Sequence, residues 1–444
     1  MSDNIIIDFR LLRPQYTTKA QPAADLPMRL CAQLWPESDS PVLDCCYCDA
    51  IELNTPETIL SMADLVYDDR NHDFSREQQT EAARIFAANL RTEFNDRKLT
   101  CIIPDSTNDF ELSTVRNQLN SHFTDVDFLP ASIAAVFDWQ QRSSAKLTAR
   151  QLIIVIDAMR SALQLTPIQT AEDTKNKRIV LERHPGITLQ APGLLNQLAT
   201  LTQACKLPEI MTDFPGWNGL ASECGKLVIL HRDNWHELME KDADQFRQLE
   251  IDGQSLQQEI SNLCAALNYK ATPILLCASE LVRHPDIPVC SPCLGGMEWL
   301  RQQQQSPELP LWYDYLPELS MEVMRNGKFE QFPLISRENR RIAPVRGKTV
   351  TLSLNTRFTL PGGLECCRFP LFRGKGGTAL SFNAEIHSSA FPLNEPTDCE
   401  LTLTYTYGAE EPFDIWYLYD KDKYDGEPTF SKILKYVKDN DLNI

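Results

Sequence analysis

Two apolar runs of this chain each end in an aspartate, and no glycine follows either one. Residues 5–7 lead into Asp8, and residues 152–156 lead into Asp157. A strand that carries an aspartate at its carboxyl end is the usual start of a phosphate-binding turn, in which glycines let backbone N–H groups approach the ligand. The five residues after each aspartate contain no glycine. The pattern therefore predicts a nucleotide-binding type of scaffold that has lost its nucleotide chemistry.

The first two thirds of the chain alternate between strand-like and helix-like spacing of apolar residues. The predicted strands are 99–103, 126–129 and 273–278, and the predicted helices are 75–90, 110–121, 131–141 and 251–267. Strands that alternate with helices of this length favour a mixed or parallel sheet covered by helices.

After residue 307 the pattern changes to runs in which apolar and polar residues alternate. The alternating runs are rich in Thr, Tyr and Phe and are separated by Pro, Gly and Asn; they span 350–354, 365–372, 380–386, 399–407 and 413–418. A period of two with turn signals between the runs predicts an antiparallel β-sandwich. Residues 429–440 have the spacing of one short amphipathic helix.

Charge and apolar content limit the class of partner and the location. The formal net charge of -18 argues against general binding to nucleic acid or to anionic membranes, because like charges repel. No apolar run approaches the roughly 20 residues of a membrane helix, and the amino terminus has no basic region followed by an apolar core. We therefore expect a cytoplasmic protein with no membrane partner, whose 14 cysteines are free thiols.

The order of these pieces resembles that of the DnaK-type heat-shock chaperones, members of the actin-like ATPase superfamily. The stretches that carry the resemblance are 101–105 with Asn108 and Asp109, 129–136, 153–157, 275–279 with Arg283 and Pro285, 293–297, 311–319, 324–329, 333–335 and 342–344. The resemblance implies an actin-like nucleotide-binding-type domain over 1–306, with lobe I at about 1–165 and lobe II at about 166–290. It also implies a β-sandwich substrate-binding-like domain over 307–420 and a helical tail over 421–444.

The departures from that family's pattern fall on its phosphate and nucleotide contacts. Arg10, Leu11 and Leu12 stand where the family has Gly, Thr and Thr; residues 158–161 replace a glycine run; Ala162 and Gln164 replace a threonine and an aspartate; Leu129 replaces a glutamate; and Cys277 and Ala278 replace paired glycines. Phosphoryl transfer depends on positioning and on charge stabilisation around phosphate and Mg²⁺. We therefore expect no ATPase activity, no catalytic residue and no bound ATP or ADP. The vestigial nucleotide site would comprise Asp8, Asp157, Ser279, Gly295 and Gly296.

Two groups of residues allow a metal site as one interpretation. Asp8 and Asp157 could hold a metal ion, or could simply cap their turns. Cys45, Cys48, Cys290 and Cys293 have the count of zinc ligands, and the last two have the spacing. The other interpretation, buried apolar thiols, is the one we favour, because no histidine lies near either cysteine cluster.

A basic segment stands out against the acidic chain. Residues 325–375 contain 11 Lys and Arg against three acids. The residues with the strongest claim to bind a partner are interleaved with Phe; they are Arg340, Arg341, Arg346, Lys348, Arg357, Arg368, Arg373 and Lys375. Such a mixture suits phosphate or an acidic protein. A solvated face that complements the chain's own acidic part is the alternative.

Three hypotheses of function follow. The first is a DnaK-like pseudo-chaperone without ATP hydrolysis, which binds another protein through an acidic segment or an extended peptide. The second is an active, divergent ATP-dependent chaperone. The third is a nucleic-acid-associated subunit of a bacterial complex, for example one for defence, whose basic segment contacts phosphates.

Overall fold

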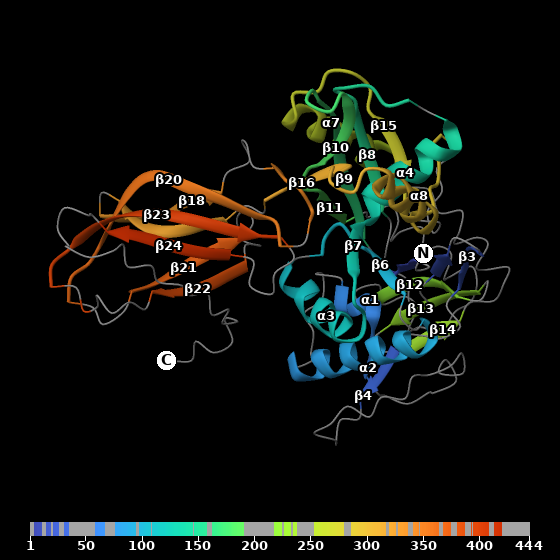
Figure 1. The fold of residues 1–444 in the computed structure, drawn as a ribbon, viewed down its shortest axis with the longest axis horizontal. Coiled ribbons are helices and arrows are strands. Elements are labelled where there is room, and N and C mark those ends of the chain that lie inside the picture. Colours follow the sequence, from blue (N-terminus) through green and yellow to red (C-terminus); the bar gives the residue numbers. More distant parts are fainter. Residues whose placement is uncertain are drawn as a thin grey trace. The chain divides into compact units, whose positions relative to one another are not determined.

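The computed structural model divides into two compact units, Met1–Trp312 and Tyr313–Ile444 (Figure 1). The residues that the structure describes are 4–10, 15–18, 21–25, 31–34, 58–66, 76–94, 97–107, 109–144, 146–157, 162–190, 217–223, 226–231, 234–237, 253–278, 286–316, 319–325, 327–335, 341–345, 347–363, 367–373, 380–386, 392, 394–407 and 413–419.

The first sheet of the first unit is built around a buried strand. Its order is β3-β2-β1-β6-β7, and its strands are β1 (Asn4–Asp8), β2 (Gln15–Thr18), β3 (Gln21–Asp25), β6 (Lys98–Ile103) and β7 (Val126–Pro130). Strands β1, β6 and β7 are parallel, whereas β2 and β3 continue the sheet antiparallel. Residues 5–8 of β1 are all buried, because both faces of this strand are covered.

The second sheet of this unit places the other strand that ends in an aspartate. Its strands follow the order β15-β8-β9-β10, with β11 also paired to β9; they are β8 (Leu152–Asp157), β9 (Ala162–Asp173), β10 (Arg178–Arg183), β11 (Ile187–Gln190) and β15 (Ile274–Cys277). Strand β15 is parallel to β8, and β9 is antiparallel to β8 and β10. The predicted mixed sheet covered by helices is confirmed.

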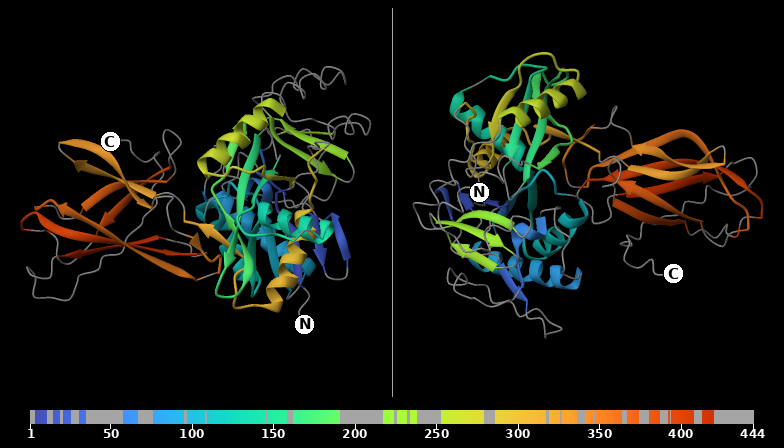
Figure 2. Two further views of the ribbon diagram at one scale, coloured as in Figure 1. Left: turned by 90° about the horizontal axis from the view of Figure 1, so that it is seen from above. Right: turned by 180° about the vertical axis from the view of Figure 1, so that it is seen from behind.

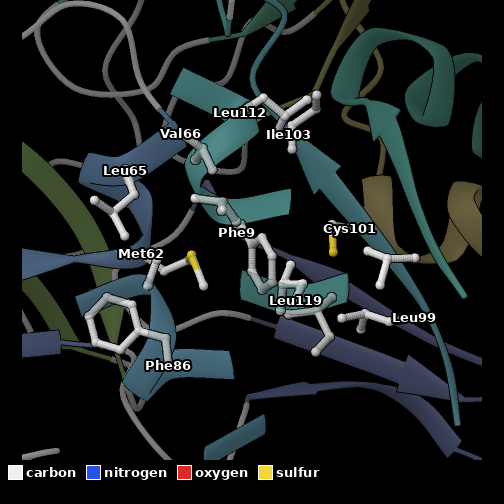
Figure 3. Packing of buried hydrophobic residues seen from close by; sticks show 14 of the residues in the cluster. Phe9, Met62, Leu65, Val66, Phe86, Leu99, Cys101, Ile103, Leu112 and Leu119 are labelled. Carbon is white, nitrogen blue, oxygen red and sulfur yellow. The ribbon is translucent and has the colours of Figure 1, made fainter. Parts of the chain in front are cut away.

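Helices cover both faces of these sheets. They are α1 (Met62–Val66), α2 (Arg76–Phe94), α3 (Asp109–His122), α4 (Ala131–Ser143), α7 (Gly253–Ala266) and α8 (Pro292–Gln305). One core cluster contains Ile5 and Ile7 of β1 with side chains of α2 and α3. Figure 3 labels two of the latter, Phe86 of α2 and Leu119 of α3. A second cluster contains Ile6 of β1 together with residues of α4 and α8. Alternate side chains of β1 therefore enter cores on opposite faces.

Two small antiparallel sheets complete the described part of the first unit. One contains β12 (Trp217–Glu223), β13 (Lys226–His231) and β14 (Asn234–Glu237), and the other contains β4 (Cys31–Leu34) and β5 (Thr58–Ser61).

The strands of the second unit, orange to red in Figure 2, belong mainly to two antiparallel sheets. One has the order β18-β17-β21-β22, from β17 (Leu319–Arg325), β18 (Lys328–Ile335), β21 (Cys367–Arg373) and β22 (Leu380–Ile386). The other has the order β20-β23-β24, from β20 (Thr349–Leu360), β23 (Thr397–Thr406) and β24 (Phe413–Tyr419). The short strand β19 (Arg341–Ile342) pairs with β16 (Trp312–Tyr315).

One ring contact joins the two sheets of the second unit. Phe332 of β18 and Phe358 of β20 meet edge to face, with ring centroids 5.4 Å apart. The predicted antiparallel strands after residue 307 are present, while their arrangement as a sandwich stays a prediction. The predicted tail helix over 429–440 lies outside the described residues.

Candidate functional site

The two aspartates that end apolar strands are joined by a buried arginine. Asp8 ends β1, Asp157 ends β8, and Arg10 lies two residues after Asp8. All three residues are at most 4% exposed. Together with Ala278, which follows β15, they form what we call the Arg10 cluster.

The guanidinium of Arg10 donates to every other member of the Arg10 cluster. Its Nε lies 2.9 Å from Asp8 Oδ1 and its Nη2 lies 2.7 Å from Asp8 Oδ2, which makes a bidentate pair. Its Nη1 lies 2.9 Å from Asp157 Oδ2, and its Nη2 also lies 3.1 Å from the carbonyl oxygen of Ala278. The arginine therefore ties the end of β1 to the ends of two strands in the other sheet.

The backbone also uses Asp8. The N–H group of Arg10 donates to Asp8 Oδ1 at 3.1 Å, so that the carboxylate caps the turn after β1. This capping is the second of the two interpretations that the sequence left open for the aspartates.

Asp157 is satisfied less fully than Asp8. Its Oδ1 is buried and has no hydrogen-bond partner among the described residues. Burial raises the pKa of Asp157 to about 6, although Arg10 lowers it; the charges of Asp105 and Asp8 raise it further. The Arg10 cluster thus contains one carboxylate that holds its negative charge weakly near neutral pH.

A second, half-buried ion pair joins the same two sheets. Asp105 follows β6, and its Oδ2 accepts the backbone N–H of Ser132, at the start of α4, at 2.9 Å. Its Oδ1 accepts the Ser132 hydroxyl at 2.5 Å and Arg183 Nη1, from the end of β10, at 3.1 Å. The Asp105 side chain is 1% exposed and that of Arg183 is 17% exposed, so the described part of the first unit carries one buried and one half-buried arginine–aspartate link between these sheets.

Gly295 and Gly296, which the sequence resemblance assigned to the vestigial nucleotide site, lie where α8 packs against α4 and β1. A Cβ atom at Gly295 would lie 1.8 Å from the carbonyl oxygen of Ala134 in α4. A Cβ atom at Gly296 would lie 2.8 Å from Cγ2 of Ile6 in β1. These glycines therefore let α8 approach both α4 and the first sheet closely.

Two further positions of the predicted nucleotide site are an apolar residue and a residue outside the described ones. Leu129, which stands where the resemblance implies a glutamate, is fully buried in the second core cluster. Ser279 lies outside the described residues.

The residues present do not fit a Mg²⁺–phosphate group in this arrangement. The facing oxygens of Asp8 and Asp157 accept hydrogen bonds from the guanidinium of Arg10. A divalent cation between these carboxylates would have to displace a positive group that is already buried there.

Four of the cysteines whose side chains the structure describes are buried, namely Cys101, Cys277, Cys290 and Cys293, and Cys264 is half-buried. Cys290 and Cys293 are each 1% exposed, and burial raises the pKa of Cys290 to about 12. Zinc binds the thiolate, which this environment disfavours. Cys45 and Cys48 lie outside the described residues, and within the described ones no group of three or more His, Cys, Asp or Glu is placed to hold a metal ion.

The structure describes only part of the basic segment. Arg341 lies over the ring of Tyr313, 4.6 Å from its centroid, and Lys348 is exposed. The backbones of the positions in β20 and β21 are described without their side chains; these are Arg357, Arg368 and Arg373. Outside the described residues lie Arg340, Arg346 and Lys375.

Sequence reasoning missed the two arginines that carry the site. It treated Arg10 only as a replacement for glycine and did not single out Arg183. The position of Arg10 could have indicated its role. An arginine two residues after a strand-end aspartate has a side chain long enough to contact the end of a neighbouring strand as well. No sequence pattern pointed to Arg183, because its partner Asp105 lies 78 residues away.

Comparisons with known proteins give a distant structural likeness. No protein-family model and no curated protein match the chain. Among solved structures, that of MamK, an actin-like ATPase, as a non-polymerising mutant bound to AMPPNP, is similar with 9% sequence identity and a TM-score of 0.35. The match covers 62% of this chain and 85% of that chain. A likeness this distant carries no argument about activity. None of the described helices is both long enough and apolar enough to cross a membrane.

Proposed function

We propose that this chain is a DnaK-like pseudo-chaperone of the cytoplasm, a protein-binding or assembly component that neither binds nor hydrolyses ATP. The observation that carries the proposal is the position of Arg10. Its guanidinium is buried between the two strand-end carboxylates, where the resemblance implies a metal–phosphate group.

The charge of Arg10 supports a scaffold that stays closed without ligand. An actin-like ATPase would bring its two sheets together around nucleotide and metal, according to the resemblance. Here the arginine supplies a permanent cation to both carboxylates, and Arg183 adds a second link through Asp105. A guanidinium keeps its charge at every physiological pH, so that neither link depends on a diffusible cofactor.

The second unit supplies the binding surface in this proposal. Antiparallel sheets have edges at which an extended peptide can add as a further strand. The basic segment around Arg341 and Lys348 favours a partner with an acidic segment. Without ATP to change the affinity, binding would be constitutive rather than cyclic.

Calorimetry of the purified chain with Mg·ATP and with Mg·ADP tests the nucleotide part of the proposal. We expect no heat of binding and no phosphate release. Arg84→Ala, in an exposed ion pair on α2, serves as a control for Arg10→Ala, and neither change should create binding. Micromolar binding with turnover by the unaltered chain would instead support the divergent chaperone.

A further inference from the structure

Strand β18 has an unpaired edge in the part of the second unit that the structure describes. It ends the sheet β18-β17-β21-β22, so among the described strands only β17 pairs with it. The backbone groups along such an edge are available to a strand from another molecule.

The hairpin formed by β17 and β18 extends beyond the third strand. Strand β17 pairs with β21 only over Leu319–Met321, whereas it pairs with β18 as far as Arg325. The outer part of the hairpin is therefore a two-stranded ribbon among the described strands. Such a ribbon is marginally stable in water and gains from pairing with a further strand.

The outer part of the hairpin also carries an exposed apolar pair. Met324 and Phe329 lie directly opposite each other, and each is 67% exposed. Lys328 and Glu330, on either side of Phe329, are exposed as well. Because Lys328 and Glu330 have opposite charges, an antiparallel pair of such strands centred on Phe329 would be complementary in charge.

We propose that two copies of this chain associate through their β18 edges, which pair antiparallel about a twofold axis at Phe329. In this register Phe329 lies opposite Phe329 of the second copy. Lys328 lies opposite Glu330 of the second copy, and the symmetry produces this ion pair twice. Met324 would lie beside the two phenyl rings on the same face of the joined sheet.

Charge selects this register over its neighbours. The twofold axis that relates two antiparallel edge strands is perpendicular to the joined sheet, so each face of one copy continues in the same face of the other. Residues opposite each other must therefore point to the same face. An axis at Lys328 would place two lysines opposite each other, and an axis at Glu330 would place two glutamates opposite each other. Like charges in opposite positions destabilise a sheet.

Proline excludes the next register. An axis at Gln331 would place Pro333 opposite Phe329 of the second copy, and a proline cannot donate a hydrogen bond to the ladder. In the register centred on Phe329 the paired stretch spans 327–331, and Pro333 lies beyond it. Among axes at Lys328, Phe329, Glu330 and Gln331, the edge is therefore self-complementary only in the register centred on Phe329.

The size of the contact sets the expected affinity. A paired stretch of five residues from each copy is at the small end of specific interfaces, so the association should be weak and concentration-dependent. Sedimentation equilibrium of the full chain, over a wide range of protein concentration, measures it directly.

Charge reversal tests the register. Lys328→Glu leaves the ion pair between Arg325 and Glu330 within the hairpin in place and makes both contacts between copies repulsive. It should weaken association about tenfold or more. Glu330→Lys should do the same, and the double variant K328E/E330K should restore it to within about threefold of the unaltered chain.

Two further variants complete the test. Phe329→Ser should weaken association, whereas Lys146→Glu, at an exposed position of the first unit, should leave it unchanged. Circular dichroism checks that every variant is folded. The proposal fails if the unaltered chain is monomeric at all concentrations, or if the double variant dissociates as readily as the single ones.

Discussion

Arg10 donates two side-chain hydrogen bonds to Asp8 but only one to Asp157, from Nη1 to Oδ2 at 2.9 Å. The bidentate pair fixes the arginine to its own strand end, and the single bond reaches across to the other sheet. Burial is the main cause of the raised pKa of Asp157. Its second oxygen is buried without a hydrogen-bond partner among the described residues.

Arg10→Met should destabilise the chain by about 3–5 kcal/mol, because it leaves buried carboxylates without their cation. Urea unfolding at neutral pH measures the loss. The control Arg84→Met removes an exposed ion pair of α2 and should cost no more than about 1 kcal/mol. A change at Arg10 as small as the change at Arg84 would contradict the role given to the buried guanidinium.

Replacing the whole ion-pair group separates charge from packing. In R10M/D8L/D157L no charge of the Arg10 cluster is left uncompensated, so much of the stability lost in Arg10→Met should return. Unfolding midpoints of the single and triple variants measure this recovery. If the triple variant is the less stable of the two, packing around the arginine matters more than its charge.

Asp157→Asn should change how stability depends on pH. The folded pKa of about 6 lies above the ordinary value of 3.8, so the folded state binds the proton more tightly than the unfolded state. Protonated Asp157 therefore contributes to the free energy of unfolding at low pH. As the pH rises from about 4 to about 7 this contribution is lost, and the loss is at most about 3 kcal/mol. The unfolding free energy of the unaltered chain minus that of Asp157→Asn should therefore fall between pH about 4 and about 7. Above pH about 7 it should stay constant.

Gly295→Ala should cost about 3 kcal/mol or more, since its Cβ would lie 1.8 Å from a backbone oxygen of α4. Thermal unfolding by circular dichroism measures the effect. Gln304→Ala, on an exposed position of the same helix, should change stability by less than about 0.5 kcal/mol. Equal effects of the two changes would show that α8 can move away from α4 at little cost.

Arg183→Met should cost about 3 kcal/mol, because Asp105 keeps its hydrogen bonds from Ser132 but loses its cation while 1% exposed. Denaturant unfolding, with Arg178→Met on the same strand as control, measures it. Arg178 pairs with a more exposed Asp173, so its loss should cost less.

Local sequence patterns predicted most of the elements that surround the Arg10 cluster. The predicted strand 99–103 is β6, and the predicted helices 110–121 and 131–141 are α3 and α4 with ends shifted by one or two residues. These elements are predictable because each has one buried face or is buried throughout. Burial requires apolar residues at a regular spacing, or in a continuous run, and the sequence shows this directly.

Strand β9 was not predicted, although it lies between β8 and β10. Pro167 interrupts its apolar pattern, and a proline normally argues against a central strand. In the structure Pro167 lies opposite Ile154 of β8. The position of β9 in the sheet depends on pairing with strands that lie elsewhere in the sequence. A local pattern of residues carries no information about such partners.

The sequence by itself determined that two strands end in aspartates and that no glycine-rich turn follows them. Only the tertiary structure decided what those aspartates contact. Asp8 and Asp157 are 149 positions apart, and the bond from Arg10 to Asp157 exists because two separate sheets bring their strand ends together around one guanidinium. Propensity and periodicity act over a few residues, whereas the compensation of a buried charge is settled by whichever groups the fold places within hydrogen-bond distance.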